Sequence, residues 1–150
     1  MSETIVVGYD GKEPSERALD AAIEAVKSAG GRVVAAVVEY MPVDPSMPSM
    51  TSLDVMAAAE PPLGPLDEPP PPLQALMDRA KARVDAAGVA GEYMWRFGDP
   101  AREIADVAIE QNATKIMIGR DEKGFFGRLL GANVEGELER EAPCEVVVVD

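Results

Sequence analysis

Short apolar runs that alternate with stretches of helical periodicity constrain the fold of this chain more than any other feature. The strand-like segments span residues 4–9, 32–39, 91–97, 116–118 and 144–149; most are apolar runs, whereas 91–97 alternates and has Tyr93, Trp95 and Phe97 on one side. Runs that are apolar throughout are typical of parallel strands covered by helices on both faces. The order βα, βα, βα, βα, β therefore predicts an α/β domain, in which a doubly wound parallel sheet of five strands is the middle of three layers.

The ends of the expected helices are also marked in the sequence. Pro14 suits the first turn of the first helix, and Gly30 suits its end. Asp99 followed by Pro100 is typical of a helix N-terminus. A short last helix is expected over residues 133–141, so that helices separate all five strands.

Residues 41–72 differ in composition from the rest of the chain. This interval holds ten of the thirteen prolines and four of the eight methionines. Proline at this density is incompatible with a regular helix or an inner strand. We predict a single domain over residues 1–150 with a flexible insertion at about 41–72, and regular structure resuming at Leu73. The insertion is either a mobile surface segment with polyproline II character, or a lid or partner-binding arm whose methionines pack adaptably.

The composition argues against several functions. A formal net charge of −13 opposes binding to nucleic acid or to an acidic membrane. The chain has no histidine, which excludes histidine-based acid–base catalysis and histidine metal ligation. The single Cys144 cannot form an intramolecular disulfide and is interpreted as a core residue. No stretch resembles a signal peptide or a membrane span, so we expect a cytoplasmic protein.

The fold class itself indicates where a ligand would bind. Doubly wound sheets bind ligands beyond the carboxyl ends of their strands, where the strand order reverses. The first and fourth strands are expected to be central neighbours, which brings Asp10 near Gly119. A loop over residues 119–133, punctuated by glycines, follows the fourth strand and leads into a helix. Such a loop presents backbone N–H groups to an anion, so any small ligand is expected here.

Three stretches of the chain resemble the universal stress protein family. They read IVVGYDGKEPSERAL (5–19), GDPAREI (98–104), and a closing part with KIMIG (115–119), RLL (128–130) and APCEVVVV (142–149). The match covers nearly the whole chain except the proline-rich interval. The resemblance implies an adenine-nucleotide alpha-hydrolase-like, Rossmann-like fold. It also implies a homodimer in which the last strands, Glu145–Val149, pair edge to edge.

Many members of this family bind ATP through a loop of pattern G-x2-G-x9-G-(S/T) and an aspartate after the first strand. The resemblance implies that Asp10 lies near the ribose and adenine, that Val38 lies against the base, and that Gly119 is the first loop glycine. Glu122 and Ala132 stand where the second and third glycines are expected. The complete set of candidate residues for the nucleotide is Gly8, Asp10, Val38, Ile118, Gly119, Glu122, Lys123, Gly131, Ala132, Asn133 and Val134.

The two replaced glycines leave two interpretations of the loop open. Glycine allows backbone to approach a phosphate closely and to adopt positive φ, whereas Glu122 adds both a side chain and negative charge. A one-residue slip would put Gly131 in the third glycine's place, Lys123 would supply positive charge, and Asn133 can still cap the next helix. The loop is therefore either a solvated turn without nucleotide or a site that binds ATP or another adenine nucleotide, with Mg, in altered geometry.

We expect a stress-response regulatory or binding module rather than an enzyme, acting by a ligand-linked or partner-linked population shift. The alternative is a member that binds no nucleotide and acts through dimerisation and the 41–72 arm. A slow ATPase is a third candidate, with Asp10 and Asp121 as the magnesium ligands, although the sequence indicates no positioned base.

Overall fold

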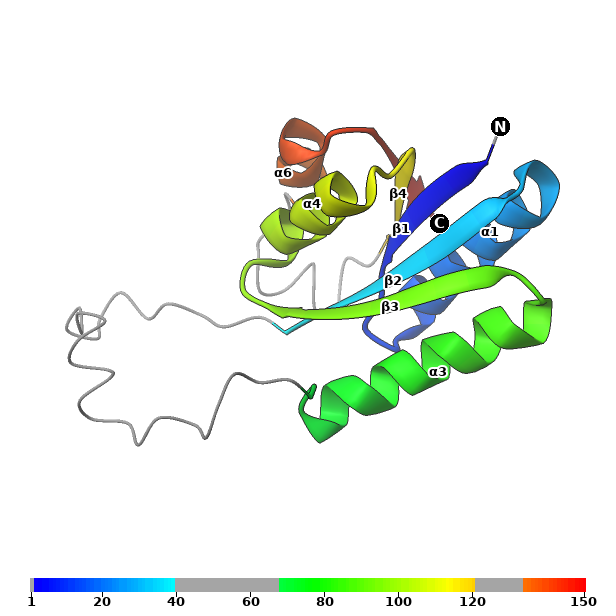
Figure 1. The fold of residues 1–150 in the computed structure, drawn as a ribbon. Coiled ribbons are helices and arrows are strands. Elements are labelled where there is room, and N and C mark those ends of the chain that lie inside the picture. Colours follow the sequence, from blue (N-terminus) through cyan, green and yellow to red (C-terminus); the bar gives the residue numbers. More distant parts are fainter. Residues whose placement is uncertain (1, 40–67, 121–133) are drawn as a thin grey trace.

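The computed structural model describes residues 2–39, 68–120 and 134–150, and these residues adopt the expected α/β arrangement (Figure 1). The elements are β1 (Glu3–Gly8), α1 (Glu13–Ala29), β2 (Gly31–Glu39), α3 (Pro71–Ala87), β3 (Ala90–Phe97), α4 (Pro100–Gln111), β4 (Lys115–Gly119), α6 (Val134–Glu141) and β5 (Glu145–Val149). Most of the predicted 41–72 insertion lies outside the described residues.

The described strands form one parallel sheet in the order β3-β2-β1-β4-β5. The chain moves outward from β1 to β2 and β3, and then returns to the other side of β1 for β4 and β5. The order therefore reverses between β1 and β4. This confirms the prediction that the first and fourth strands are central neighbours.

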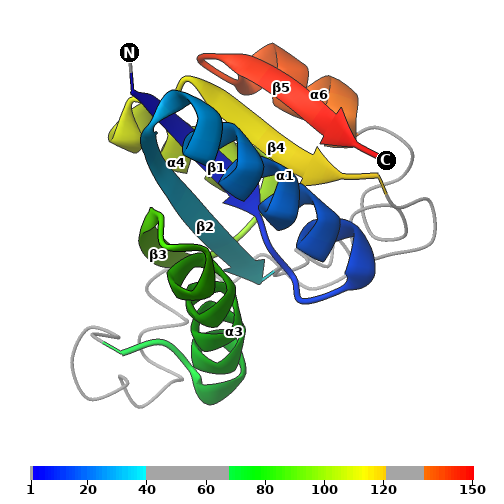
Figure 2. The same ribbon diagram turned by 90° about the vertical axis from the view of Figure 1, so that its right-hand side faces the viewer.

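Helices cover both faces of this sheet, as Figures 1 and 2 show. On one face, α1 and α3 pack in a core that includes Val7 and Val33. On the other face, α4 and α6 pack in a core that includes Val6 and Val34. Adjacent residues of one strand serve opposite cores because side chains alternate across a strand. The predicted three-layer, doubly wound sheet is confirmed.

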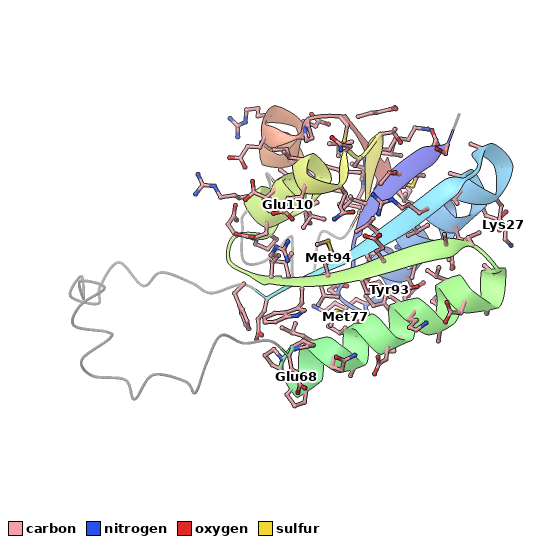
Figure 3. All side chains as sticks on the ribbon, in the orientation of Figure 1. Lys27, Glu68, Met77, Tyr93, Met94 and Glu110 are labelled. Carbon is pink, nitrogen blue, oxygen red and sulfur yellow. The ribbon has the colours of Figure 1, made fainter. Side chains whose placement is uncertain are left out.

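The edge strand β3 shows the same alternation. Tyr93, Trp95 and Phe97 pack on the face covered by α1 and α3, and the Trp95 and Phe97 rings meet edge to face. Figure 3 shows Tyr93 beside Met77 of α3, and Met94 on the opposite face of the strand. There the sulfur of Met94 lies 3.6 Å from the Gln111 side-chain nitrogen at the end of α4.

Helix α3 corrects one detail of the sequence prediction. It begins at Pro71, two residues before the predicted resumption of regular structure at Leu73, with Pro70 as its N-cap. The statement that proline excludes helix throughout residues 41–72 is therefore wrong for Pro71 and Pro72. The N–H groups of a helix's first turn have no acceptor within the helix, so proline costs no hydrogen bond there.

Candidate functional site

The switch point of the sheet lies at the carboxyl ends of the neighbouring strands β1 and β4. Gly8 ends β1 and is buried, and Asp10 follows it in a half-buried position. Gly119 ends β4 and is also half-buried. Strand β2 ends at this edge too, and it continues past Gly8, whose register partner is Ala36, to Val38 and Glu39. Gly8, Asp10, Val38 and Gly119 therefore lie at the carboxyl ends of three neighbouring strands.

Asp10 is held in a short hydrogen-bonded turn before α1. Its Oδ1 accepts from the backbone N–H of Lys12 at 3.0 Å, and its own backbone N–H donates to Ser15 Oγ at 3.2 Å. The Ser15 hydroxyl donates in turn to the Lys12 carbonyl at 3.0 Å and is almost fully buried. Among the described residues, none bonds to the second carboxylate oxygen of Asp10. The turn thus fixes one oxygen, and the other can accept a ligand hydroxyl.

Gly119 is in direct backbone contact with the start of α1. A Cβ at this position would lie 2.1 Å from the Pro14 carbonyl oxygen and 2.3 Å from the Pro14 carbonyl carbon. Only glycine leaves room for this approach, so α1 itself requires glycine here whether or not a ligand binds. The same contact brings the end of β4 against the first turn of α1, four residues after Asp10.

Two other predicted site residues differ in their burial. Val38 is half-buried on the α4 face of β2, where part of its side chain stays accessible. Ile118 is only 5% exposed and belongs to the core beneath α4 and α6. Val38 can therefore offer apolar side-chain surface to a ligand. The Ile118 side chain serves the core, so its part in a site is limited to its backbone.

The remaining predicted site residues lie in the loop between β4 and α6. Glu122, Lys123, Gly131, Ala132 and Asn133 are outside the described residues, as is the candidate magnesium ligand Asp121. Val134 is the first residue of α6. Their roles in the site therefore stay predictions.

A polar network that the sequence pattern does not predict lies next to the Asp10 turn. The Tyr9 hydroxyl, on a side chain that is 1% exposed, donates to the Glu16 carboxylate. Arg79 and Arg83 of α3 pair with the same carboxylate at 3.1 and 2.7 Å. Burial, and then the Glu16 carboxylate, raise the pKa of Tyr9 well above its ordinary value, so it stays a neutral donor at physiological pH. The spacing of the two arginines on α3 predicts a shared helix face, but it does not identify what they contact.

A shallow recess of about 400 Å³ lies near the N-terminus of α4. Asp99, Arg102, Arg140 and Glu141 line it. The Asp99 side chain accepts from the Arg102 N–H at 3.3 Å, which confirms its predicted helix-capping role. The two carboxylates and two guanidinium groups offset each other in charge, so the recess has no clear preference for an anion or a cation.

The described part of the chain meets neither the requirements of a metal site nor those of a reactive thiol. Within residues 2–39, 68–120 and 134–150, no group of three or more histidine, cysteine or acidic side chains is arranged to hold a metal ion. Cys144 is half-buried against the α4–α6 core, and burial raises the pKa of its thiol. A protonated, packed thiol agrees with the interpretation of Cys144 as a core residue.

The strand order, which reverses beside β1, defines a Rossmann-like α/β protein. The turn that contains Asp10 lies at this reversal, where such folds bind ligands. The model of the universal stress protein family matches residues 1–150, and the chain belongs to this family. In a Thermus aquaticus relative named "Universal stress protein in QAH/OAS sulfhydrylase 3'region", 28% of the residues are identical over 99% of both chains.

Solved structures show the same fold. A universal stress protein in complex with cAMP superposes with a TM-score of 0.68 at 23% identity, covering 99% of this chain and 96% of that one. An Archaeoglobus fulgidus universal stress protein in complex with dAMP gives a TM-score of 0.61 at 21% identity, covering 100% and 98%. In the part of the chain that the structure describes, no helix has the length and apolar character needed to cross a membrane.

The contact between Gly119 and Pro14 leads to a stability prediction. Gly119→Ala should lower the free energy of unfolding by about 3 kcal/mol, because the new methyl group meets fixed backbone. Gly8→Ala is the matched control at the end of the neighbouring strand. Its Cβ would lie 2.8 Å from Ile104 Cδ1, the end of a side chain that can rotate, so about 1 kcal/mol is expected. Urea unfolding of both variants measures the difference, and equal losses would contradict the described approach of α1 to β4.

Proposed function

We propose that this universal stress protein binds an adenine nucleotide where β1 and β4 end, and that it works as a stress-response binding or regulatory module. The observation that carries the proposal is the contact of Gly119 with Pro14, which joins the end of β4 to the start of α1, just after the Asp10 turn. A carboxylate with one fixed oxygen and one available oxygen therefore stands at the switch point. Among the structural neighbours, one was solved with cAMP and another with dAMP, so adenine nucleotides are the ligands to test first.

The described residues fit the ribose and base of such a ligand. The available Asp10 oxygen suits a ribose hydroxyl, since an ionised carboxylate accepts hydrogen bonds strongly. The partly accessible Val38 side chain, on the adjacent strand, suits the apolar face of a base. Phosphates would be bound by residues of the 119–133 loop, with Gly131 or Ala132, Lys123 and Asn133 as candidates and Glu122 opposing them. In the slow-ATPase alternative, Asp10 and Asp121 would instead be the magnesium ligands.

Removal of the Asp10 carboxylate tests this site. In titration calorimetry with ATP, ADP, AMP and cAMP, with and without magnesium, Asp10→Ala should weaken binding about tenfold or more, because a charge-assisted hydrogen bond is lost. Asp20→Ala removes an exposed carboxylate that pairs with Arg83 on α3, so it matches the change in charge and should leave the affinity unchanged. Absence of heat from the unaltered protein at millimolar nucleotide would rule out the nucleotide site.

Binding without turnover is part of the same proposal, and a slow ATPase is the alternative. Purified protein with ATP and magnesium should release phosphate no faster than the Asp10→Ala variant does in the same assay. A rate that is abolished by Asp10→Ala and kept by Asp20→Ala would favour the ATPase instead, because contaminating activity would be insensitive to both changes.

The homodimer through Glu145–Val149 is the second part of the proposal. Among the described strands, β5 pairs only with β4, and its valines are half-buried, unlike the buried valines of β1. The backbone N–H of Arg120 donates to the Val149 carbonyl, so Val149 and Val147 point their backbone groups toward β4. Val146 and Val148 therefore point theirs outward, because backbone groups alternate along a strand. An unpaired apolar edge of this kind favours pairing with a second copy.

Proline at the outward-facing position tests this dimer. The unaltered chain of 15.9 kDa should have about twice this mass in light scattering. Val148→Pro removes an outward N–H and should yield a folded monomer, because edge strands tolerate proline where no ladder bond is lost. Val148→Ala keeps the N–H while shortening the side chain, and it should stay dimeric. A monomeric unaltered protein at micromolar concentration would contradict the pairing. The partner-binding role of the 41–72 arm concerns residues outside the described part and stays a prediction.

A further inference from the structure

Helix α3 contacts the Asp10 turn through Arg79. The Nη2 atom of Arg79 donates to the Gly11 carbonyl oxygen at 3.2 Å and to Glu16 Oε1 at 3.1 Å. Gly11 follows Asp10 directly and has a φ of +77°, a conformation that L side chains rarely adopt. A Cβ on Gly11 would lie 2.6 Å from Leu76 Cδ2 and 2.8 Å from Arg79 Nη1. Side chains of α3 therefore pack directly against the backbone next to Asp10.

Tyr9, which precedes Asp10, is bound to the Glu16 carboxylate, as Arg79 is. The buried Tyr9 hydroxyl donates to Glu16 Oε1, the oxygen that also accepts from Arg79. Glu16 thus holds Tyr9 directly, and it holds Gly11 through the guanidinium of Arg79. Because both neighbours of Asp10 are restrained, the direction of the Asp10 carboxylate depends on this arrangement.

Arg83 lies one turn further along α3 and shares part of the network. It pairs with Glu16 Oε2 at 2.7 Å and with Asp20 Oδ2 at 2.6 Å. Among the described residues, Arg83 donates hydrogen bonds to Asp20 on α1, and none of its hydrogen bonds goes to residues 10–12. Both arginines therefore pair with Glu16 on α1, whose side chain is only 13% exposed. Arg83 adds an ion pair with the exposed Asp20, whereas Arg79 adds the hydrogen bond to the Gly11 carbonyl, and this bond to the turn distinguishes Arg79 from Arg83.

We propose that Arg79 is a positioning residue for the ligand site, which holds the Asp10 turn in its binding conformation from α3. The ligand part rests on the proposed nucleotide site, whereas the restraint on the turn is a property of the protein without ligand. Loss of the Gly11 contact lets the turn sample other conformations. The affinity for the ligand then falls in proportion to the fraction of molecules that remain in the binding conformation. The site thereby becomes sensitive to the position of α3.

Arg79→Met and Arg83→Met provide a matched test. Each variant keeps most of the aliphatic stem and removes one guanidinium that pairs with Glu16. Amide exchange by NMR, without ligand, monitors the Asp10 N–H that donates to Ser15 and the Lys12 N–H that donates to Asp10. Exchange at these amides should be about tenfold faster in Arg79→Met, reflecting local opening of the turn, and unchanged in Arg83→Met. Arg83→Met removes ion pairs with two carboxylates and Arg79→Met removes one, so the thermal midpoint of Arg83→Met should be no higher than that of Arg79→Met.

Calorimetry with AMP and ATP adds the ligand readout. Arg79→Met should lower the affinity about tenfold, and Arg83→Met should leave it near that of the unaltered protein. Equal amide exchange in both variants would overturn the positioning role, as would equal affinity of both variants for a nucleotide that the unaltered protein binds. If the unaltered protein binds neither nucleotide while the contrast in exchange is observed, the proposed nucleotide function fails and the restraint on the turn is supported.

Discussion

The structure depends on a close approach that only glycine permits, between the end of β4 and the first turn of α1. Gly119 has no side chain, and the Pro14 carbonyl lies where its Cβ would be. This approach sets how deeply the start of α1 sits against the sheet, and with it the height of the Asp10 turn above the strand ends. One position therefore serves both the packing of the domain and the construction of its ligand site.

The polar network around Glu16 complements this backbone contact. In a chain with a net charge of −13, a partly buried carboxylate needs cations and donors close by, and Arg79, Arg83 and Tyr9 supply them. The network ties α1 to α3 directly beneath the turn. An anionic ligand at the same edge meets an unfavourable overall field, so its affinity has to come from local N–H groups and positioned side chains.

Much of the candidate site could be predicted from sequence because the strand order restricts where loops meet. The apolar runs indicated parallel strands, and the reversal rule then brought Asp10 close to Gly119. The reason for the glycine was only partly predicted. The family pattern predicts that Gly119 lets the backbone approach a phosphate, whereas the structure shows that packing against Pro14 requires glycine at this position. The predicted start of α3 is two residues too late. From sequence alone, prolines in the first turn of a helix cannot be distinguished from prolines that prevent a helix.

The succession of strands and helices, the two-sided burial of the sheet and the family could all be predicted from the amino-acid sequence. These properties follow from patterns within a few residues of one another, or from motifs read in order. Three contacts are visible only in the folded protein: Arg79 binds the Gly11 carbonyl, Glu16 binds Tyr9 and two arginines, and Pro14 meets Gly119. Those contacts join residues far apart in the chain, and they depend on how α1 and α3 sit on the sheet. No local spacing encodes that placement, because it results from the packing of whole helices against the strands.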